Sequence, residues 1–248
     1  MNQEKDSTWY TDWFNSPWYH KLYKHRDAAE AEHFIRLISQ KLGIPLGARV
    51  LDLACGKGRH AIALSKFGFN VTGIDISEES ITEAKKSENG SLHFFVYDMR
   101  KNFREDYFDV IFNLFTSFGY FVRDEDNGAV IKAVYNDLKQ GGLFILDIFN
   151  SEKVKKAVAE NPDGTINEGT IRIAWSKKIF NNMVMKEIVV NENGKNQYFS
   201  EMVKLYTEKD IRAFLGNEFE VKYTFGDYSL NEFDVNTSDR LIIVAQKK

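Results

Sequence analysis

The chain has little cysteine and proline and no large excess of one charge, and the cysteine count and the charge each exclude a class of protein. Its 248 residues include one cysteine and three prolines, with a formal net charge of -3. A single cysteine cannot form an internal disulfide, so stability has to come from a packed core. No dense run of Lys or Arg marks a nucleic-acid-binding groove, and no apolar run is long enough to span a membrane. With a polar sequence at residues 1–10, we expect a cytoplasmic protein whose partner is a small molecule, with no nucleic-acid or membrane partner.

What the sequence does contain is a regular alternation of extended and helical patterns. A helix is predicted over 27–42, where Asp27 can cap the first turn and apolar residues recur every three or four positions. Extended runs follow at 49–54, 70–75, 92–97, 107–112 and 143–149, and helical runs at 60–67, 77–86, 127–139 and 207–215. This alternation predicts an α/β fold with a doubly wound, mostly parallel sheet. Two further runs, 219–229 and 240–248, predict a terminal antiparallel hairpin and bring the sheet to seven strands.

The pattern changes between Thr170 and Leu205. Three extended runs are joined there by NN and NENGK, residues that tolerate the positive φ angles of hairpin turns. They predict a small antiparallel β insertion, so the chain divides into an N-terminal aromatic lid segment (1–27), an α/β core (28–160 and 207–248) and an inserted meander (161–206). Ile171, Ile173 and Trp175 alternate onto one face of a strand. That face is expected to cover the cleft or to contact a second copy of the chain in a homo-oligomer.

The stretch ACGKGRH, residues 54–60, lies where the first extended run ends and a helix begins. Gly56 and Gly58 permit a tight turn and close approach of a ligand, and the helix start presents free N–H groups. With Ala61 the glycines also satisfy G-x-G-x-x-A, so an NAD(P)-binding Rossmann oxidoreductase is one candidate. The loop therefore predicts a nucleotide-type ligand without fixing which one.

Three aspartates at strand ends narrow the choice. Asp52 precedes the glycine turn, Asp75 ends the second extended run, and Asp98 follows the third. Asp75 can accept hydrogen bonds from two ribose hydroxyls, and Asp98 can face an adenine amino group. Because Asp52 would repel a pyrophosphate, this edge favours a cationic nucleoside that carries no phosphate.

At these residues the chain resembles the class I S-adenosylmethionine-dependent methyltransferases. DLACGKG is similar to that family's glycine loop, with Ala54 in place of its usual first glycine, and the extra strands after the fifth core strand resemble the glycine N-methyltransferase-like branch. The resemblance implies a Rossmann-like sheet and S-adenosylmethionine as cofactor. It also implies contacts to the methionine part from Asp52, Ala54, Gly56 and Gly58, to ribose and adenine from Asp75 and Ile76, to the adenine edge from Asp98 and Met99, and a further contact from Asn113.

The N-terminal segment is unusually aromatic, with Trp9, Tyr10, Trp13, Phe14, Trp18, Tyr19 and Tyr23. One interpretation is a helix packed on the core. The other is a lid, because aromatic faces suit a sulfonium and Arg26 could pair with the cofactor's carboxylate. The resembling families favour Tyr19 and Arg26 as cofactor contacts.

Methyl transfer from a sulfonium requires alignment and exclusion of water, and a general base is optional. Candidate bases near the predicted mouth are His20, Tyr120 and Tyr228. Cys55 is interpreted as a small loop residue, because the reaction needs no enzyme nucleophile. No spacing of His, Asp or Glu indicates a metal site. We expect a methyltransferase that uses in-line displacement on a small-molecule acceptor; the alternatives are an oxidoreductase and a non-catalytic cofactor-binding module.

Overall fold

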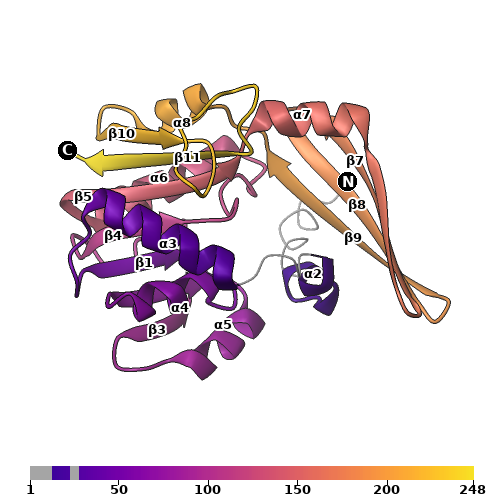
Figure 1. Ribbon diagram of the computed structural model, residues 1–248, viewed down its shortest axis with the longest axis horizontal. Coiled ribbons are helices and arrows are strands. Elements are labelled where there is room, and N and C mark those ends of the chain that lie inside the picture. The colour runs from indigo at the N-terminus through magenta and orange to yellow at the C-terminus, as the bar shows by residue number, and fades with distance from the viewer. Residues whose placement is uncertain (1–12, 23–27) are drawn as a thin grey trace.

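A seven-stranded sheet, the core sheet, organises most of the chain (Figure 1). The computed structural model describes residues 13–22 and 28–248. Within them the strand order is β3-β2-β1-β4-β5-β11-β10. The bounds are β1 (Arg49–Leu53), β2 (Asn70–Asp75), β3 (Leu92–Val96), β4 (Phe108–Asn113), β5 (Leu138–Phe149), β10 (Phe219–Phe225) and β11 (Arg240–Lys247). Only β11 runs antiparallel to its neighbours, so the predicted parallel sheet with a terminal antiparallel hairpin is confirmed.

Helices cover both faces of the core sheet. The helices α3 (Ala28–Leu42), α4 (Arg59–Lys66) and α5 (Glu78–Ala84), the last followed by a short 3₁₀ turn (Lys85–Ser87), lie on one face; α6 (Asp124–Asp137) and α8 (Glu208–Leu215) lie on the other. Successive strand residues serve opposite faces: Val50 packs with α3 and α4, and Leu51 packs with α6. The sequence pattern placed the end of α6 two residues too late. The strand β5 starts at Leu138, and an irregularity in its pairing with β4 before Leu143 accommodates Gly141 and Gly142.

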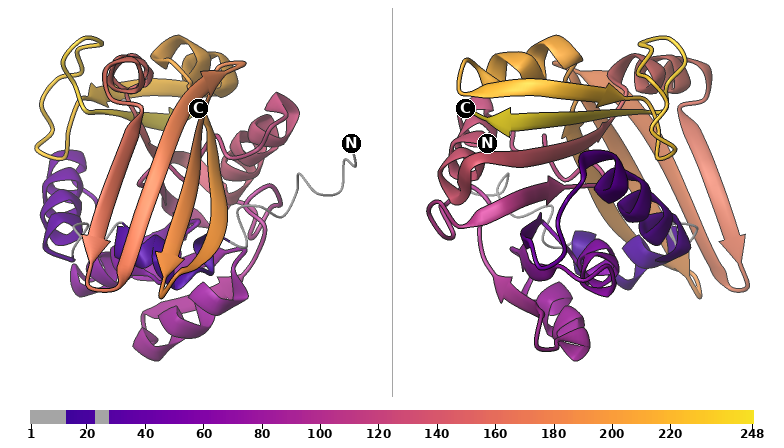
Figure 2. Two further views of the ribbon diagram at one scale, coloured as in Figure 1. Left: turned by 90° about the vertical axis from the view of Figure 1, so that its right-hand side faces the viewer. Right: turned by 60° about the vertical axis from the view of Figure 1, so that its left-hand side comes forward.

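A second, four-stranded antiparallel sheet stands beside the core, and we call it the meander sheet (Figures 1 and 2). It contains β6 (Asp163–Glu168), β7 (Ile171–Phe180), β8 (Met183–Glu192) and β9 (Lys195–Lys204), and α7 (Ser151–Glu160) connects it to β5. The turn residues Asn181, Asn182 and Asn193 have positive φ, as predicted. We expected three strands and no α7. The strand β6 escapes the sequence pattern because its residues, DGTINE, are mostly polar and it pairs on one side only.

The helix α2 (Pro17–Leu22) lies between the core and the meander sheet (Figure 1). Trp13, together with Trp18 and Leu22 of α2, packs against Ile173 and Val190 on the inner face of the meander sheet. The strand face with Ile171, Ile173 and Trp175 therefore packs against Trp13, Trp18 and Leu22. Trp9, Tyr10, Tyr23, Arg26 and the Asp27 cap lie outside the described residues. In the described part of the chain, no helix combines the length and apolarity needed to cross a membrane.

Candidate active site

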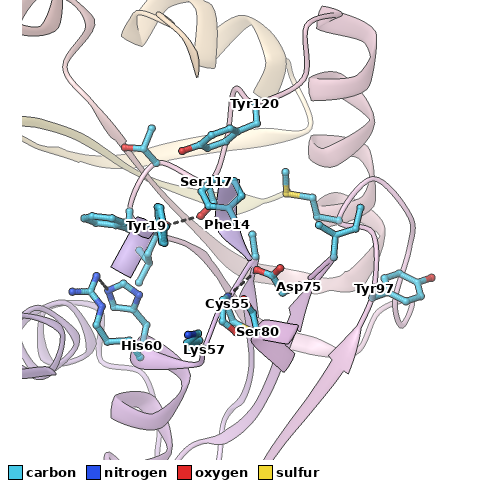
Figure 3. A pocket seen from close by; sticks show the side chains of 18 of the residues that line it. Phe14, Tyr19, Cys55, Lys57, His60, Asp75, Ser80, Tyr97, Ser117 and Tyr120 are labelled. Atoms are coloured by element: carbon cyan, nitrogen blue, oxygen red, sulfur yellow. Dashed lines mark hydrogen bonds between the residues drawn. The ribbon is translucent and has the colours of Figure 1, made fainter. Parts of the chain in front are cut away.

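The core sheet reverses its strand order between β1 and β4, and a cavity of about 320 Å³ opens at the carboxyl ends of these strands. Ligands of open α/β sheets bind at this position, and the volume is that of a site for a small organic molecule. The glycine loop, the end of β2 and the loop after β4 form its floor, and Phe14 and Tyr19 reach it from the N-terminal segment (Figure 3). We call it the first cavity.

The two loop glycines have different roles. Gly56 lines the first cavity, and a Cβ added to it would meet nothing within 4 Å, so its backbone is open to a ligand. Gly58 does not line the cavity; a Cβ there would lie 2.6 Å from the Phe94 ring, so close packing requires glycine at this position. Both have positive φ, as does Ala54 at 61°, where glycine is favoured. The loop conformation thus explains why a family of this kind prefers glycine at the position of Ala54.

Asp75 faces the first cavity from the end of β2. Its Oδ2 accepts the N–H of Gly56 at 2.8 Å, and its Oδ1 accepts the N–H of Ser77, also at 2.8 Å. Burial raises the pKa of this carboxyl, and the amide hydrogen bonds oppose the shift. A carboxylate offers about four acceptor sites, so two amides leave capacity for ligand hydroxyls.

Asp98, Met99 and Ile76 line the far end of the first cavity, beside Tyr97 and Phe121. The Arg100 guanidinium binds both oxygens of Asp98, at 2.7 to 3.1 Å. Burial would raise the pKa of Asp98, but these hydrogen bonds outweigh it and hold the pKa below its usual range. This end of the cavity is therefore a mainly apolar slot, with one carboxylate already paired to a cation.

Asp52 and Asn113 lie beneath the cavity rather than on its wall. Burial raises the pKa of Asp52 to about 7, opposed by a hydrogen bond from the Ala61 amide. Asn113 donates to the carbonyl of Leu53 at 2.9 Å, tying the end of β4 to that of β1. Asp52 Oδ2 and Asn113 Oδ1 have no hydrogen-bond partner among the described residues. These two buried oxygens beside the glycine loop lack a hydrogen-bond partner in the described part of the chain, which leaves them acceptor capacity.

The loop after β4 is strained and firmly held. Phe115 and Thr116 have φ values of 64° and 59°, which residues other than glycine rarely adopt. Asp147 of β5 accepts the Phe115 N–H at its carboxylate (2.8 Å) and the Thr116 N–H at its backbone carbonyl (2.9 Å). Arg240 of β11 donates to Asp147 Oδ1 (2.7 Å) and to Thr116 Oγ1 (2.9 Å). A buried ion pair thus fixes one wall of the cavity.

The candidate bases gain little support from this geometry. Tyr228 does not line the cavity, and its hydroxyl donates to Asp147 at 2.9 Å. Tyr120 does line it and donates to Glu201 at 3.4 Å. Burial raises the pKa of both phenols well above the usual range, so both keep their protons at neutral pH. The His20 side chain and Arg26 lie outside the described residues.

Two further groups at the site are kept uncharged. Burial raises the pKa of the Cys55 thiol well above its usual range, which agrees with a small loop residue rather than a nucleophile. Burial lowers the pKa of His60, a cavity residue that our sequence reading did not single out. Among the described residues, no group of three His, Cys, Asp or Glu side chains is placed to hold a metal ion.

A second cavity, of about 240 Å³, adjoins the first. The two share Tyr19, Phe115, Thr116 and Tyr120 in their walls. From there the second cavity extends between Arg240 and the inner face of the meander sheet. The cleft therefore has one compartment built by strand ends and another built between the core and the meander sheet.

Comparison with known proteins shows that this chain is similar to methyltransferases. A family model described as a methyltransferase domain matches residues 50–142. A putative methyltransferase of Geobacillus sp. (strain WCH70) is 26% identical over 93% of this chain and 97% of its own. A glycine/sarcosine N-methyltransferase of Halorhodospira halochloris is 25% identical over 96% of this chain and 89% of its own. The chain contains a methyltransferase domain, and these relatives support an S-adenosylmethionine-dependent methyltransferase.

Solved structures agree on the fold of this methyltransferase. An S-adenosylmethionine-dependent methyltransferase from Clostridium acetobutylicum ATCC 824 superposes with a TM-score of 0.79 at 24% identity, covering 92% of this chain and 96% of the other. An S-adenosylmethionine-bound amino pentose methyltransferase from Micromonospora echinaspora has a TM-score of 0.66 at 18% identity, over 94% and 98%. The methyltransferase domain and the methyltransferase relatives favour this reading over the oxidoreductase alternative. Its G-x-G-x-x-A match arises because a strand–turn–helix unit needs small residues at the same places.

Proposed function

We propose that this methyltransferase transfers a methyl group from S-adenosylmethionine in the first cavity to a small-molecule acceptor in the second. The observation that carries the proposal is the shared wall between the two cavities, at Tyr19, Phe115, Thr116 and Tyr120. Because these residues line both cavities, a donor in the first and an acceptor in the second would meet beside the loop after β4. The enclosed volumes of about 320 and 240 Å³ suit small ligands.

The residues of the first cavity fit the cofactor. Asp75 has acceptor capacity for two ribose hydroxyls, and Ile76 and Met99 offer apolar surface to adenine. Gly56 leaves backbone room for the methionine part, and Tyr19 stands above it as a cation-tolerant ring. Asp52 Oδ2, which lacks a partner among the described residues, leaves acceptor capacity beside the loop. These roles, and that of Asp98 toward the adenine edge, are part of the proposal.

The acceptor atom that we propose is an amine nitrogen. The phenols of Tyr120 and Tyr228 keep their protons, and burial lowers the pKa of His60, which makes this neutral imidazole of the first cavity a weak base. A neutral amine needs none, since its lone pair is already available. Two of the relatives above also carry names of proteins that methylate small amines or aminosugars, which supports the same choice.

The chemistry requires little beyond alignment. Bound S-adenosylmethionine supplies a sulfonium whose C–S bond breaks as the amine lone pair forms the new N–C bond, leaving a thioether and an ammonium that then loses its proton to water. The strained Phe115–Thr116 segment, held by Asp147 and Arg240, keeps the shared wall rigid. Phe14 and Tyr19 cover the junction and exclude water. Positioning and desolvation are the protein's contribution.

Calorimetry tests the proposal directly. We expect S-adenosylmethionine and S-adenosylhomocysteine to bind with one site each and NADH not to bind. A screen of small amines should then release S-adenosylhomocysteine. Transfer to tRNA or protein substrates but to no small molecule would refute the acceptor class, and failure of both nucleosides to bind would refute the cofactor site.

A further inference from the structure

A row of charged side chains crosses the inner face of the meander sheet between two apolar rows. Lys177, Lys186 and Glu201 stand directly opposite one another on β7, β8 and β9. All three line the second cavity. On one side the row is flanked by Trp175 and Ile188, and on the other by an apolar row in which Val184 opposes Val203. We call it the charged row.

The charged row is costly to the fold. Lys186 is 9% exposed, although lysine is rarely buried to that degree, and like charges directly opposite in a sheet destabilise it. Burial lowers the pKa of Lys186 to about 8; Glu201 opposes that shift and Lys177 adds to it. A network that served structure alone would balance its charges or use apolar residues. A row retained at this cost points to a ligand.

The row and its surroundings carry a positive excess. Two ammonium groups face the cavity with one carboxylate, Glu201, which also accepts the Tyr120 hydroxyl. Arg240 adds no excess, because Asp147 neutralises it in a buried ion pair. With the Arg240–Asp147 pair counted as neutral, Lys177, Lys186 and Glu201 leave one positive unit at the second cavity. An anion entering this cavity would be attracted and partly desolvated there.

We propose that the charged row binds an anionic group of the methyl acceptor, a carboxylate or a phosphate, and thereby selects small acceptors that carry one. This inference rests on the proposed function, because it places the acceptor in the second cavity. The anionic group sits against the meander sheet at Lys177 and Lys186. The reacting nitrogen then extends past Tyr120 to the wall shared with the first cavity.

Matched acceptor pairs test the inference. Glycine is compared with glycinamide, and phosphoethanolamine with ethanolamine, so that each pair differs in its anion and the two pairs distinguish carboxylate from phosphate. The readout is kcat/KM from release of S-adenosylhomocysteine. We expect one anionic member to exceed its neutral partner at least tenfold. Equal use of both members, or transfer to neutral members alone, would overturn the inference and leave the proposed function standing.

Three variants locate the anion. Lys177→Met and Lys186→Met should each lower kcat/KM for the anionic acceptor at least tenfold and leave the neutral partner within threefold. The matched control is Lys178→Met, because Lys178 lies on the outer face of β7, is 55% exposed and pairs with Glu187. It should change neither value. If both row variants kept the preference for the anion, the charged row would not be its site.

A binding measurement covers the case in which no panel amine is methylated. The S-adenosylhomocysteine complex is heated with sodium acetate or inorganic phosphate at constant ionic strength. A rise in melting temperature in the wild type and in Lys178→Met, but not in Lys177→Met or Lys186→Met, supports the inference. No difference among the four proteins overturns it. Absence of S-adenosylhomocysteine binding in the wild type would instead count against the proposed function.

Discussion

The core supplies its wall of the cleft from backbone and strand ends, whereas the meander sheet supplies its wall from side chains alone. On the core side, Gly56 and Asp75 hold each other through an amide–carboxylate hydrogen bond, and each sits where the fold requires that residue type. On the meander side, Lys177, Lys186 and Glu201 alternate with residues that face outward, so each can be replaced without altering a backbone turn. The core wall can therefore bind only one kind of ligand without a change of backbone, whereas substitutions on the meander wall can change which ligand binds there.

The largest expected effect tests the core wall. Asp75→Ala removes the acceptor that we propose for the ribose hydroxyls, together with the anchor of the Gly56 amide. Hydrogen bonds to a charged group contribute roughly 1.5–3 kcal/mol each, so S-adenosylmethionine affinity should fall at least about 100-fold. Calorimetry measures it, with Glu220→Ala, an exposed carboxylate on β10, as control. Retained affinity would show that the ribose lies elsewhere.

The next effect concerns stability on the meander wall. Lys186→Met should raise the free energy of unfolding at pH 7 by about 3 kcal/mol, since the pKa of Lys186 falls from 10.5 in the unfolded chain to about 8 in the fold and each unit corresponds to roughly 1.36 kcal/mol. Between pH 8 and 10.5 the unfolded chain keeps a proton that the folded protein has released. The free energy of unfolding of the wild type therefore rises with pH, and the destabilisation caused by Lys186 diminishes.

Urea denaturation of both proteins at pH 7 and pH 10 measures this difference, which should shrink at the higher pH. Lys178→Met, on the exposed face, should stay within about 0.5 kcal/mol of the wild type. A less stable Lys186→Met protein would mean that the ammonium is well compensated in the fold.

A smaller effect separates a lid from an oligomer contact. Trp175 lies over Gly164 of β6, and the Lys186 ammonium stands 5.1 Å from its ring. Trp175→Ala should lower acceptor kcat/KM about tenfold, or 1.4 kcal/mol, with cofactor affinity within about threefold. Tyr198→Ala, on the same sheet and 73% exposed, is the control. Unchanged catalysis with a dimer that dissociates in light scattering would assign the meander sheet to an oligomer interface instead.

The smallest effect returns to the glycine loop. Ala54 has a φ of 61°, which costs an L residue about 1 kcal/mol or more relative to glycine. Ala54→Gly should therefore stabilise the protein by about 0.5–1 kcal/mol, after the entropy of the unfolded glycine is subtracted. In thermal unfolding, Ala157→Gly on the exposed side of α7 should shift stability by a similar amount in the opposite direction. If Ala54→Gly lowered the stability as Ala157→Gly does, the loop would not be strained at Ala54.

The two walls also differ in how far the sequence revealed them. Hydrophobic periodicity located the core strands, and strand-end carboxylates then pointed to Asp75, because parallel strands bring their carboxyl ends to one edge. The same spacing could not tell which side of the loop a residue serves, so Asp52, Asn113 and Gly58 were expected on the cavity wall and lie beneath it or against Phe94.

Other parts of the site had no signal in the sequence. Phe121 lies outside any periodic run, and nothing local shows that it lines the first cavity. The charged row was also hidden. Alternation puts Lys177 and Lys186 on regular positions of their strands, but only the pairing register makes them direct neighbours.

The clamp on the loop after β4 makes the cleft a late product of folding. Arg240 reaches Asp147 across 93 residues of chain and Thr116 across 124. Contacts of such sequence separation form only after much of the polypeptide has been ordered, since the entropy of closing long loops comes first. A chain in which β11 has not docked has no means of holding Phe115 and Thr116 in their left-handed conformations. Partly folded molecules therefore lack a formed junction between the cavities, and methylation should serve as a measure of completed folding.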